Sequence, residues 1–136
     1  ELDGVTIDPD TLTPPNTEGS LIIEGAGGLL VPLTRGITYA DVFARWQLPT
    51  IVCARTALGP INHTLMSLEA MRKRNIPILG VAFIGEEMAD SQAIIAELGQ
   101  VSVLGRLPLL PSMEPELLRQ AFSNHFDLAA FEGGKG

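Results

Sequence analysis

A lone carboxylate followed at once by glycines is the first feature of this sequence that is typical of a ligand site. Glu24 ends the short apolar run Leu21–Glu24. We interpret the run as a buried parallel strand, whose carboxyl end is where open α/β sheets bind ligands. Glu24 is therefore a candidate Mg²⁺ ligand. The turn after it is a candidate for contact with phosphate oxygens and contains Gly25, Ala26, Gly27 and Gly28. Spacing alone fits a solvated glutamate before an ordinary glycine turn equally well.

A predicted helix start is the second candidate site. Thr50–Ala54 is β-branched and apolar, which predicts a second buried strand. The segment from Pro60 to Arg74 has apolar residues at helical spacing, and proline suits a first helical position. Free N–H groups and the positive helix dipole at Gly59–Asn62 would attract an anion. For Asn62, packing within the first helical turn is an equally good reading, and for His63 packing is the better one.

These two candidates must be positioned by alternating strands and helices. Further strands are predicted at Ile76–Ile84 and Val101–Leu107. Three further helices are predicted, at Thr38–Trp46, Asp90–Leu98 and Glu114–Phe122. In the first helix Thr38 and Asp41 are close to a capping box, and Gly99 is the expected stop of the second. This alternation predicts an α/β fold with a mostly parallel sheet flanked by helices.

Composition restricts the class of protein. The 136 residues amount to one domain at most, and 46% of them are hydrophobic, which is enough for a core. The net charge of −7 argues against nucleic acid or an anionic membrane as a partner. No apolar run reaches the roughly 18 residues of a membrane helix, and we expect a cytoplasmic enzyme. The single cysteine, Cys53, lies in an apolar run, where a buried and inert thiol is the default.

Two sequence blocks carry a resemblance to a known family. They are Glu24-Gly-Ala-Gly-Gly-Leu-Leu-Val-Pro-Leu33 and Ala54-Arg-Thr-Ala-Leu-Gly-Pro-Ile-Asn-His-Thr-Leu65, with weaker support from Gly80–Phe83 and Gly105–Pro108. In these blocks, and along a stretch from about Ser20 to Phe122, the chain resembles the dethiobiotin synthetases. The resemblance implies a P-loop-NTPase-like fold. It also implies an activity, the ATP- and Mg²⁺-dependent closure of a cyclic urea from CO₂ and 7,8-diaminononanoate in biotin synthesis.

The resemblance also implies roles for individual residues. The carboxylate of the substrate would be held, across a homodimer interface, by Leu58, Gly59, Pro60, Ile61 and Asn62. The nucleotide base would lie against Ile84, Gly85, Leu107, Pro108 and Leu109. Many family members carry an asparagine that reads adenine where this chain has Ile84, so base selection by a side-chain amide is not expected. No residue of this part of the family is implied to be catalytic.

One family element is missing from the sequence, the phosphate-binding loop Gly-x-x-x-x-Gly-Lys-Ser/Thr. We therefore expect residues 1–136 to be the C-terminal portion of one nucleotide-binding domain, with a connecting segment (1–19), the sheet and helices (20–126) and a flexible tail (127–136). In the family the phosphate-loop strand lies between the acidic strand and the next one. We thus expect a missing N-terminal half, a second chain or a swapped copy to supply it, because the chain alone would not be a self-sufficient fold.

Two alternatives remain beside the synthetase. A non-catalytic or partner-dependent fragment of the fold is compatible with the absence of the lysine loop. A related cobyric-acid-type amidoligase would share the acidic strand, although the Leu-Gly-x-Ile-Asn-His wording favours the synthetase.

Overall fold

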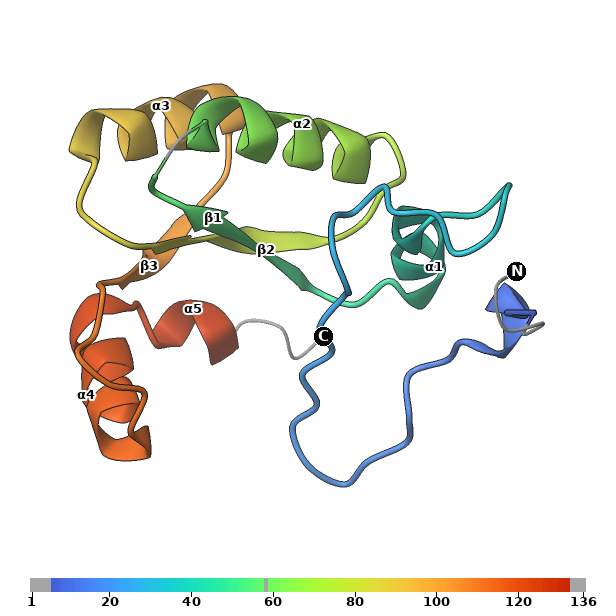
Figure 1. Ribbon diagram of the computed structural model, residues 1–136, viewed down its shortest axis with the longest axis horizontal. Coiled ribbons are helices and arrows are strands. Elements are labelled where there is room, and N and C mark those ends of the chain that lie inside the picture. Colours follow the sequence, from blue (N-terminus) through green and yellow to red (C-terminus); the bar gives the residue numbers. More distant parts are fainter. Residues whose placement is uncertain (1–5, 58, 133–136) are drawn as a thin grey trace.

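A parallel three-stranded sheet is the centre of the fold. The computed structural model describes residues 6–57 and 59–132. The strands are β1 (Thr50–Arg55), β2 (Ile78–Ile84) and β3 (Val103–Leu107), in the order β1-β2-β3, and both neighbouring pairs are parallel. The expected α/β class is confirmed. Because the strands are parallel, their carboxyl ends meet at one edge of the sheet (Figure 1).

Two helices cover one face of this sheet. They are α2 (Pro60–Arg72) and α3 (Ala89–Gly99), which follow β1 and β2 (Figure 1). The core between sheet and helices contains Val81 and Phe83 of β2 together with Leu68 of α2 and Ile95 of α3. None of these side chains is more than 1% exposed. Burial on this face fixes α2 over β1, and with it the start of α2 at the carboxyl end of the sheet.

The other face of the sheet is covered by aromatic side chains from the C-terminal residues. Phe122 of α4 (Pro115–His125) stacks on Phe126 with 4.5 Å between ring centroids, and Phe131 of α5 (Ala129–Glu132) lies 5.4 Å from Phe122. Within the segment that we expected to be a tail (127–136), Ala129–Glu132 form this short helix. Phe131 reaches back to Phe122, which lies in the preceding helix. Residues 133–136 lie outside the described part of the chain.

Leu21–Glu24, which we interpreted as a strand, is irregular and exposed in the structure, so that expectation is wrong. A parallel strand forms only when its backbone groups pair with a neighbour. In the described part of the chain no strand lies beside this run. The segment is instead held further along, where Ala40 donates its backbone N–H to the carbonyl of Leu29 (2.9 Å).

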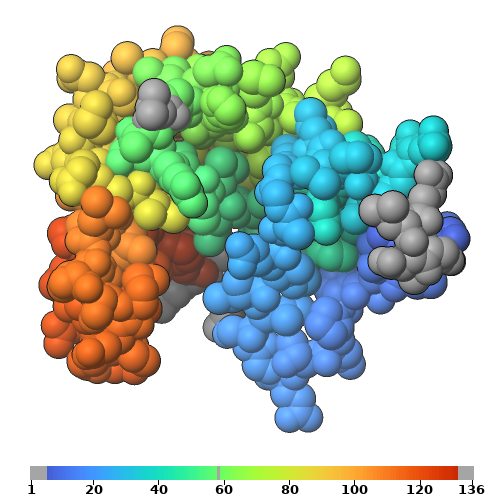
Figure 2. Space-filling view, in the orientation of Figure 1, coloured from blue at the N-terminus to red at the C-terminus, as the bar shows by residue number. Residues whose placement is uncertain are grey.

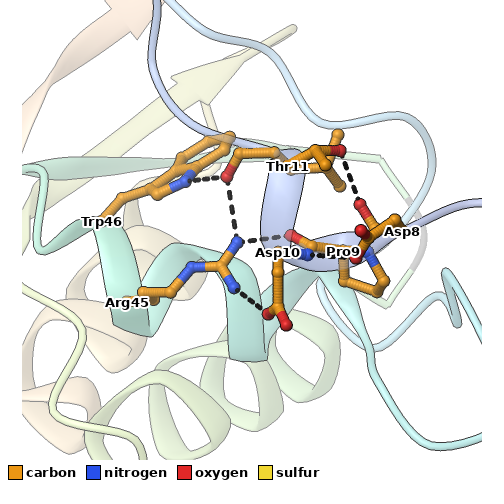
Figure 3. Close-up of polar contacts among 7 residues, drawn as sticks. Asp8, Pro9, Asp10, Thr11, Arg45 and Trp46 are labelled. Atoms are coloured by element: carbon orange, nitrogen blue, oxygen red, sulfur yellow. Dashed lines mark hydrogen bonds and ion pairs between the residues drawn. The ribbon is translucent and has the colours of Figure 1, made fainter.

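The N-terminal segment is anchored on α1 (Tyr39–Trp46). Arg45 donates to the carbonyls of Pro9 and Leu12 at 2.6 and 3.0 Å, and the indole N–H of Trp46 donates to Leu12 (2.8 Å) (Figure 3). A short 3₁₀ helix, Pro9–Thr11, lies within this network. The predicted connecting segment thus has structure of its own. In the space-filling view it forms a lobe separate from the one made by α4 (Figure 2).

The end of α3 differs from the prediction in a way that packing explains. Gln100, not Gly99, has the left-handed conformation (φ 42°), and Gly99 is still helical. A Cβ at Gly99 would lie 2.8 Å from Leu68 Cδ1 of α2. Glycine is needed there because the two helices approach closely.

Among the described residues, no helix has the length and apolar character needed to cross a membrane.

Asp41 closes the start of α1 and joins it to the segment that follows α2. Its Oδ2 accepts from the Thr38 hydroxyl (2.7 Å) and the Thr38 backbone N–H (2.8 Å), and its Oδ1 accepts from Arg74 Nε (3.0 Å). The Thr38 hydroxyl, then the Thr38 N–H and Arg74, lower the pKa of Asp41 from 3.8 to about 2. The predicted reciprocal bond of a capping box is therefore present.

We expect Asp41→Asn to lower the free energy of unfolding by about 1 kcal/mol at pH 7, a value reduced for solvent screening at a partly exposed pair. Because the folded-state pKa is depressed, this contribution is present above pH 4 and is lost as the pH falls from about 4 to about 2. Urea unfolding at several pH values measures it, with the exposed Glu87→Gln as control. A loss that stayed the same at pH 2 would contradict the assignment.

Candidate functional site

A cavity of about 350 Å³ lies at the start of α2, beside β1. Gly59 precedes the helix with φ 72°, a left-handed conformation that favours glycine, and Pro60 occupies the first helical turn. Both residues line the cavity. On the strand side the wall is Val52–Arg55, and on the helix side it continues over His63, Thr64 and Ser67. The helix dipole and free N–H groups therefore face a space lined by hydroxyl, imidazole and guanidinium groups, which suits an anionic ligand.

The predicted substrate residues are only partly brought together here. Gly59 and Pro60 line the cavity, whereas Ile61 packs against the core cluster and Asn62 is exposed and lies outside the lining. Leu58 lies outside the described residues. Sequence reasoning missed the hydroxyl of Thr64, whose residue is only 4% exposed although it borders the cavity. The signal was present, because Thr64 lies one helical turn after Pro60 and so on the same face of α2.

Glu24 lies near the strand that forms the cavity wall. Cys53, at the edge of β1, is exposed by surface area, yet surrounding atoms desolvate its sulfur. This desolvation raises the pKa of the Cys53 thiol, and the negative charge of Glu24 raises it further. The expectation that the Cys53 thiol is buried is wrong, because one side of β1 has no described neighbour.

A magnesium ion would find one protein ligand at this place. Among residues 6–57 and 59–132, no three His, Cys, Asp or Glu side chains gather in one group. Mg²⁺ keeps several waters and binds through one or two carboxylates together with substrate phosphates. The exposed carboxylate of Glu24 fits that donor set, whereas a fully protein-built metal cage has no counterpart in the described structure.

The glycine turn is placed by α1. A Cβ at Gly25 would lie 3.1 Å from the ring of Phe43, and Gly27 has φ 82°. Leu29 then packs with Met71 and Ile76 near the amino-terminal end of β2. The structure therefore does not bring Gly25–Gly28 to the carboxyl ends of β2 and β3. Because no paired strand precedes the turn, its position is set by its apolar contacts with α1.

The residues predicted at the nucleotide base do come together. The backbone N–H of Gly85 donates to the carbonyl of Leu107 (2.9 Å), which joins the ends of β2 and β3. Ile84 and Leu107 both line an apolar cavity of about 220 Å³ with the three phenylalanine rings of the C-terminal residues. Pro108 is half-buried and Leu109 is 68% exposed, and neither lines this cavity.

The AAA domain family model matches residues 1–117 of this chain. The chain belongs to the AAA domain family. The match includes β1, β2 and β3 and both candidate sites.

Proteins named ATP-dependent dethiobiotin synthetase BioD are similar to this chain over nearly its whole length. The protein from Agrobacterium fabrum is 60% identical over 130 residues, which are 96% of this chain and 61% of the relative. The one from Rhodopseudomonas palustris strain BisB5 is 59% identical over 131 residues (96% and 62%), and the one from Brucella anthropi 57% over 133 residues (98% and 63%). The resemblance expected from the two motif blocks is confirmed. The chain spans about three fifths of the length of these relatives.

The influence of Glu24 on Cys53 can be measured directly, because the chain has a single cysteine. Glu24→Gln removes a charge that raises the thiol pKa, so more thiolate is present at a given pH below that pKa. We expect alkylation of Cys53 at pH 7.5 to become about twofold faster, since charge interactions at exposed positions are weak. Mass spectrometry follows the reaction, with Glu18→Gln as control. An unchanged rate in Glu24→Gln would place Glu24 away from the strand.

Proposed function

We propose that this chain is part of an ATP- and Mg²⁺-dependent dethiobiotin synthetase, which closes the cyclic urea of dethiobiotin from CO₂ and 7,8-diaminononanoate. The observation that carries the proposal is the 57–60% identity to proteins of that name over at least 96% of the chain. Both the Glu24–Gly28 turn and the Gly59–Asn62 helix start lie inside the aligned length of the family model.

In this proposal the start of α2 binds the carboxylate of the substrate. The N–H groups at Gly59–Asn62 have no helical partner of their own, and an anion satisfies them. The adjoining cavity of about 350 Å³ has room for part of an aliphatic chain. The two amines of the substrate would then lie toward the nucleotide, where one is carboxylated to a carbamate, ATP phosphorylates the carbamate, and the second amine displaces phosphate.

The nucleotide lies along the carboxyl edge of the sheet. Ile84, Gly85, Leu107, Pro108 and Leu109 provide an apolar wall for the base, and Gly25–Gly28 would contact the phosphates, as the family resemblance implies. Glu24 would hold the magnesium ion, which supplies charge neutralisation at the phosphate oxygens when bound. The described residues contribute positioning and electrostatics, in keeping with phosphoryl transfer chemistry.

Two partners complete the proposed site. A further parallel strand, carrying the phosphate-binding loop, pairs with the open edge of β1. The backbone groups of Ile51, Cys53 and Arg55 point to that edge, because those of Thr50 and Thr56 bond to β2 and the direction alternates along a strand. A second copy of the protein forms a homodimer in which α2 of one protomer reaches the substrate of the other. We place this enzyme in the cytoplasm.

We expect Glu24→Gln to lower kcat/KM for diaminononanoate roughly a hundredfold in the intact protein. Loss of one metal ligand costs several kcal/mol of charge stabilisation in the transition state. The measurement is dethiobiotin formation across a Mg²⁺ titration, with Glu18→Gln as the control. Wild-type kcat in Glu24→Gln at every Mg²⁺ concentration would remove Glu24 from the metal site.

We further expect weak discrimination among ATP, GTP and CTP as phosphoryl donors. An apolar wall rejects analogues less well than a hydrogen-bonding side chain does. Introducing the amide by Ile84→Asn should raise the preference for ATP, whereas Ile84→Ala should leave selectivity low. Initial rates with each nucleotide measure this. A strong preference for ATP that persists in Ile84→Ala would show that other groups read the base.

A further inference from the structure

Arg106 makes a contact that neither the sequence motifs nor the proposed chemistry used. This residue of β3 donates from Nη1 to the backbone carbonyl of Gly85 (2.8 Å), in the turn after β2. The arginine is half-buried. A hydrogen bond from a charged donor is stronger than a neutral one, and partial burial limits competition from water. The contact therefore fixes the direction of the Gly85 carbonyl.

The same turn is held from two further sides. The Gly85 N–H donates to Leu107 (2.9 Å), and the Ile84 carbonyl accepts from the Thr56 N–H (2.9 Å) and, at 3.4 Å, from the Thr56 hydroxyl. Gly85 has φ 123°, and a Cβ there would lie 2.5 Å from Thr56 Oγ1. Only glycine fits, and the ends of all three strands converge on it. Among the described residues, Arg106 is the charged side chain that donates a hydrogen bond to the Gly85 carbonyl.

We propose that Arg106 is a positioning residue for the nucleotide base. By holding the Gly85 carbonyl, it fixes the turn from which Ile84 presents its side chain beside Leu107, and so keeps the apolar wall in shape before the base arrives. This inference rests on the proposed function, because it assumes that a base binds at Ile84 and Gly85. Arg106 acts through the turn and has no part in the phosphoryl transfer itself.

A second arginine offers a matched control. Arg72, near the end of α2, also donates from its guanidinium to backbone carbonyls, those of Gly99 and Gln100. That tether joins the ends of α2 and α3 at the opposite edge of the sheet, away from the proposed nucleotide site. Arg72→Met and Arg106→Met thus remove the same kind of interaction. Only Arg106→Met should weaken nucleotide binding if the effect comes from the position of the Gly85 turn and not from a general loss of stability.

The experiment compares wild type, Arg106→Met, Arg106→Lys and Arg72→Met in the intact protein. We expect Arg106→Met to raise the Kd and KM for ATP roughly tenfold, the size expected for loss of one hydrogen bond to a charged group, with kcat little changed. Arg106→Lys, which keeps a charged donor, should restore part of this affinity. Hydrogen exchange at the Gly85 amide should become faster in Arg106→Met and stay unchanged in Arg72→Met.

The outcomes separate this inference from the proposed function. Wild-type protein that failed to bind ATP would overturn the proposed function and the nucleotide role of Arg106 with it. Wild-type protein that binds ATP, with equal affinities in Arg106→Met and Arg72→Met, would overturn the role of Arg106 alone. A fall in kcat with unchanged KM would also contradict positioning of the base.

Discussion

Parallel strands satisfy their backbone N–H and C=O groups only in a neighbouring strand, and β1 has a described neighbour on one side alone. The strand is regular because β2 supplies partners for Thr50, Val52, Ala54 and Thr56, and because α2 buries its inner side chains. The backbone groups of the residues between them, Ile51, Cys53 and Arg55, face the open edge. Leu21–Glu24, with no pairing strand beside it, stays irregular despite an apolar sequence.

The same constraint explains how the three parts of the candidate site relate. The start of α2 is well placed, because its position depends on β1, β2 and the core under α2. The carboxyl ends of β2 and β3 are equally well placed, since they are paired with each other. The acidic turn depends on a strand at the open edge, and its glycines rest on α1 instead. The start of α2 and the ends of β2 and β3 are thus well formed, because the strands and helices that hold them lie within the described residues.

Much of the fold could be predicted because its signals are local. The cap at Thr38 and Asp41, the β-branched run of β1 and the proline at the start of α2 each act over a few residues. Leu21–Glu24 was misjudged because apolar sequence permits a strand but pairing creates it. The helix at Ala129–Glu132 packs the ring of Phe131 against Phe122, and no local pattern encodes that contact.

In the candidate site, too, residues with local sequence signals could be predicted and residues with long-range contacts could not. Gly59 and Pro60 were found from turn and helix-start chemistry, and Gly85 from the family resemblance. Arg106 escaped because its partner is a backbone carbonyl 21 residues away, and carbonyls leave no mark in a sequence. Thr64 escaped because a threonine inside a helix is ordinary until a cavity is seen beside it.

Hydrogen exchange at the backbone amides of Ile51, Cys53 and Arg55 tests most directly whether the open edge of β1 receives a further strand. These amides should exchange quickly in the 136-residue chain alone and at least a hundredfold more slowly in the intact protein, because pairing protects them from water. The amides of Val52 and Ala54, already paired with β2, should change much less. Slow exchange of all five amides in a monomeric 136-residue chain would contradict the account.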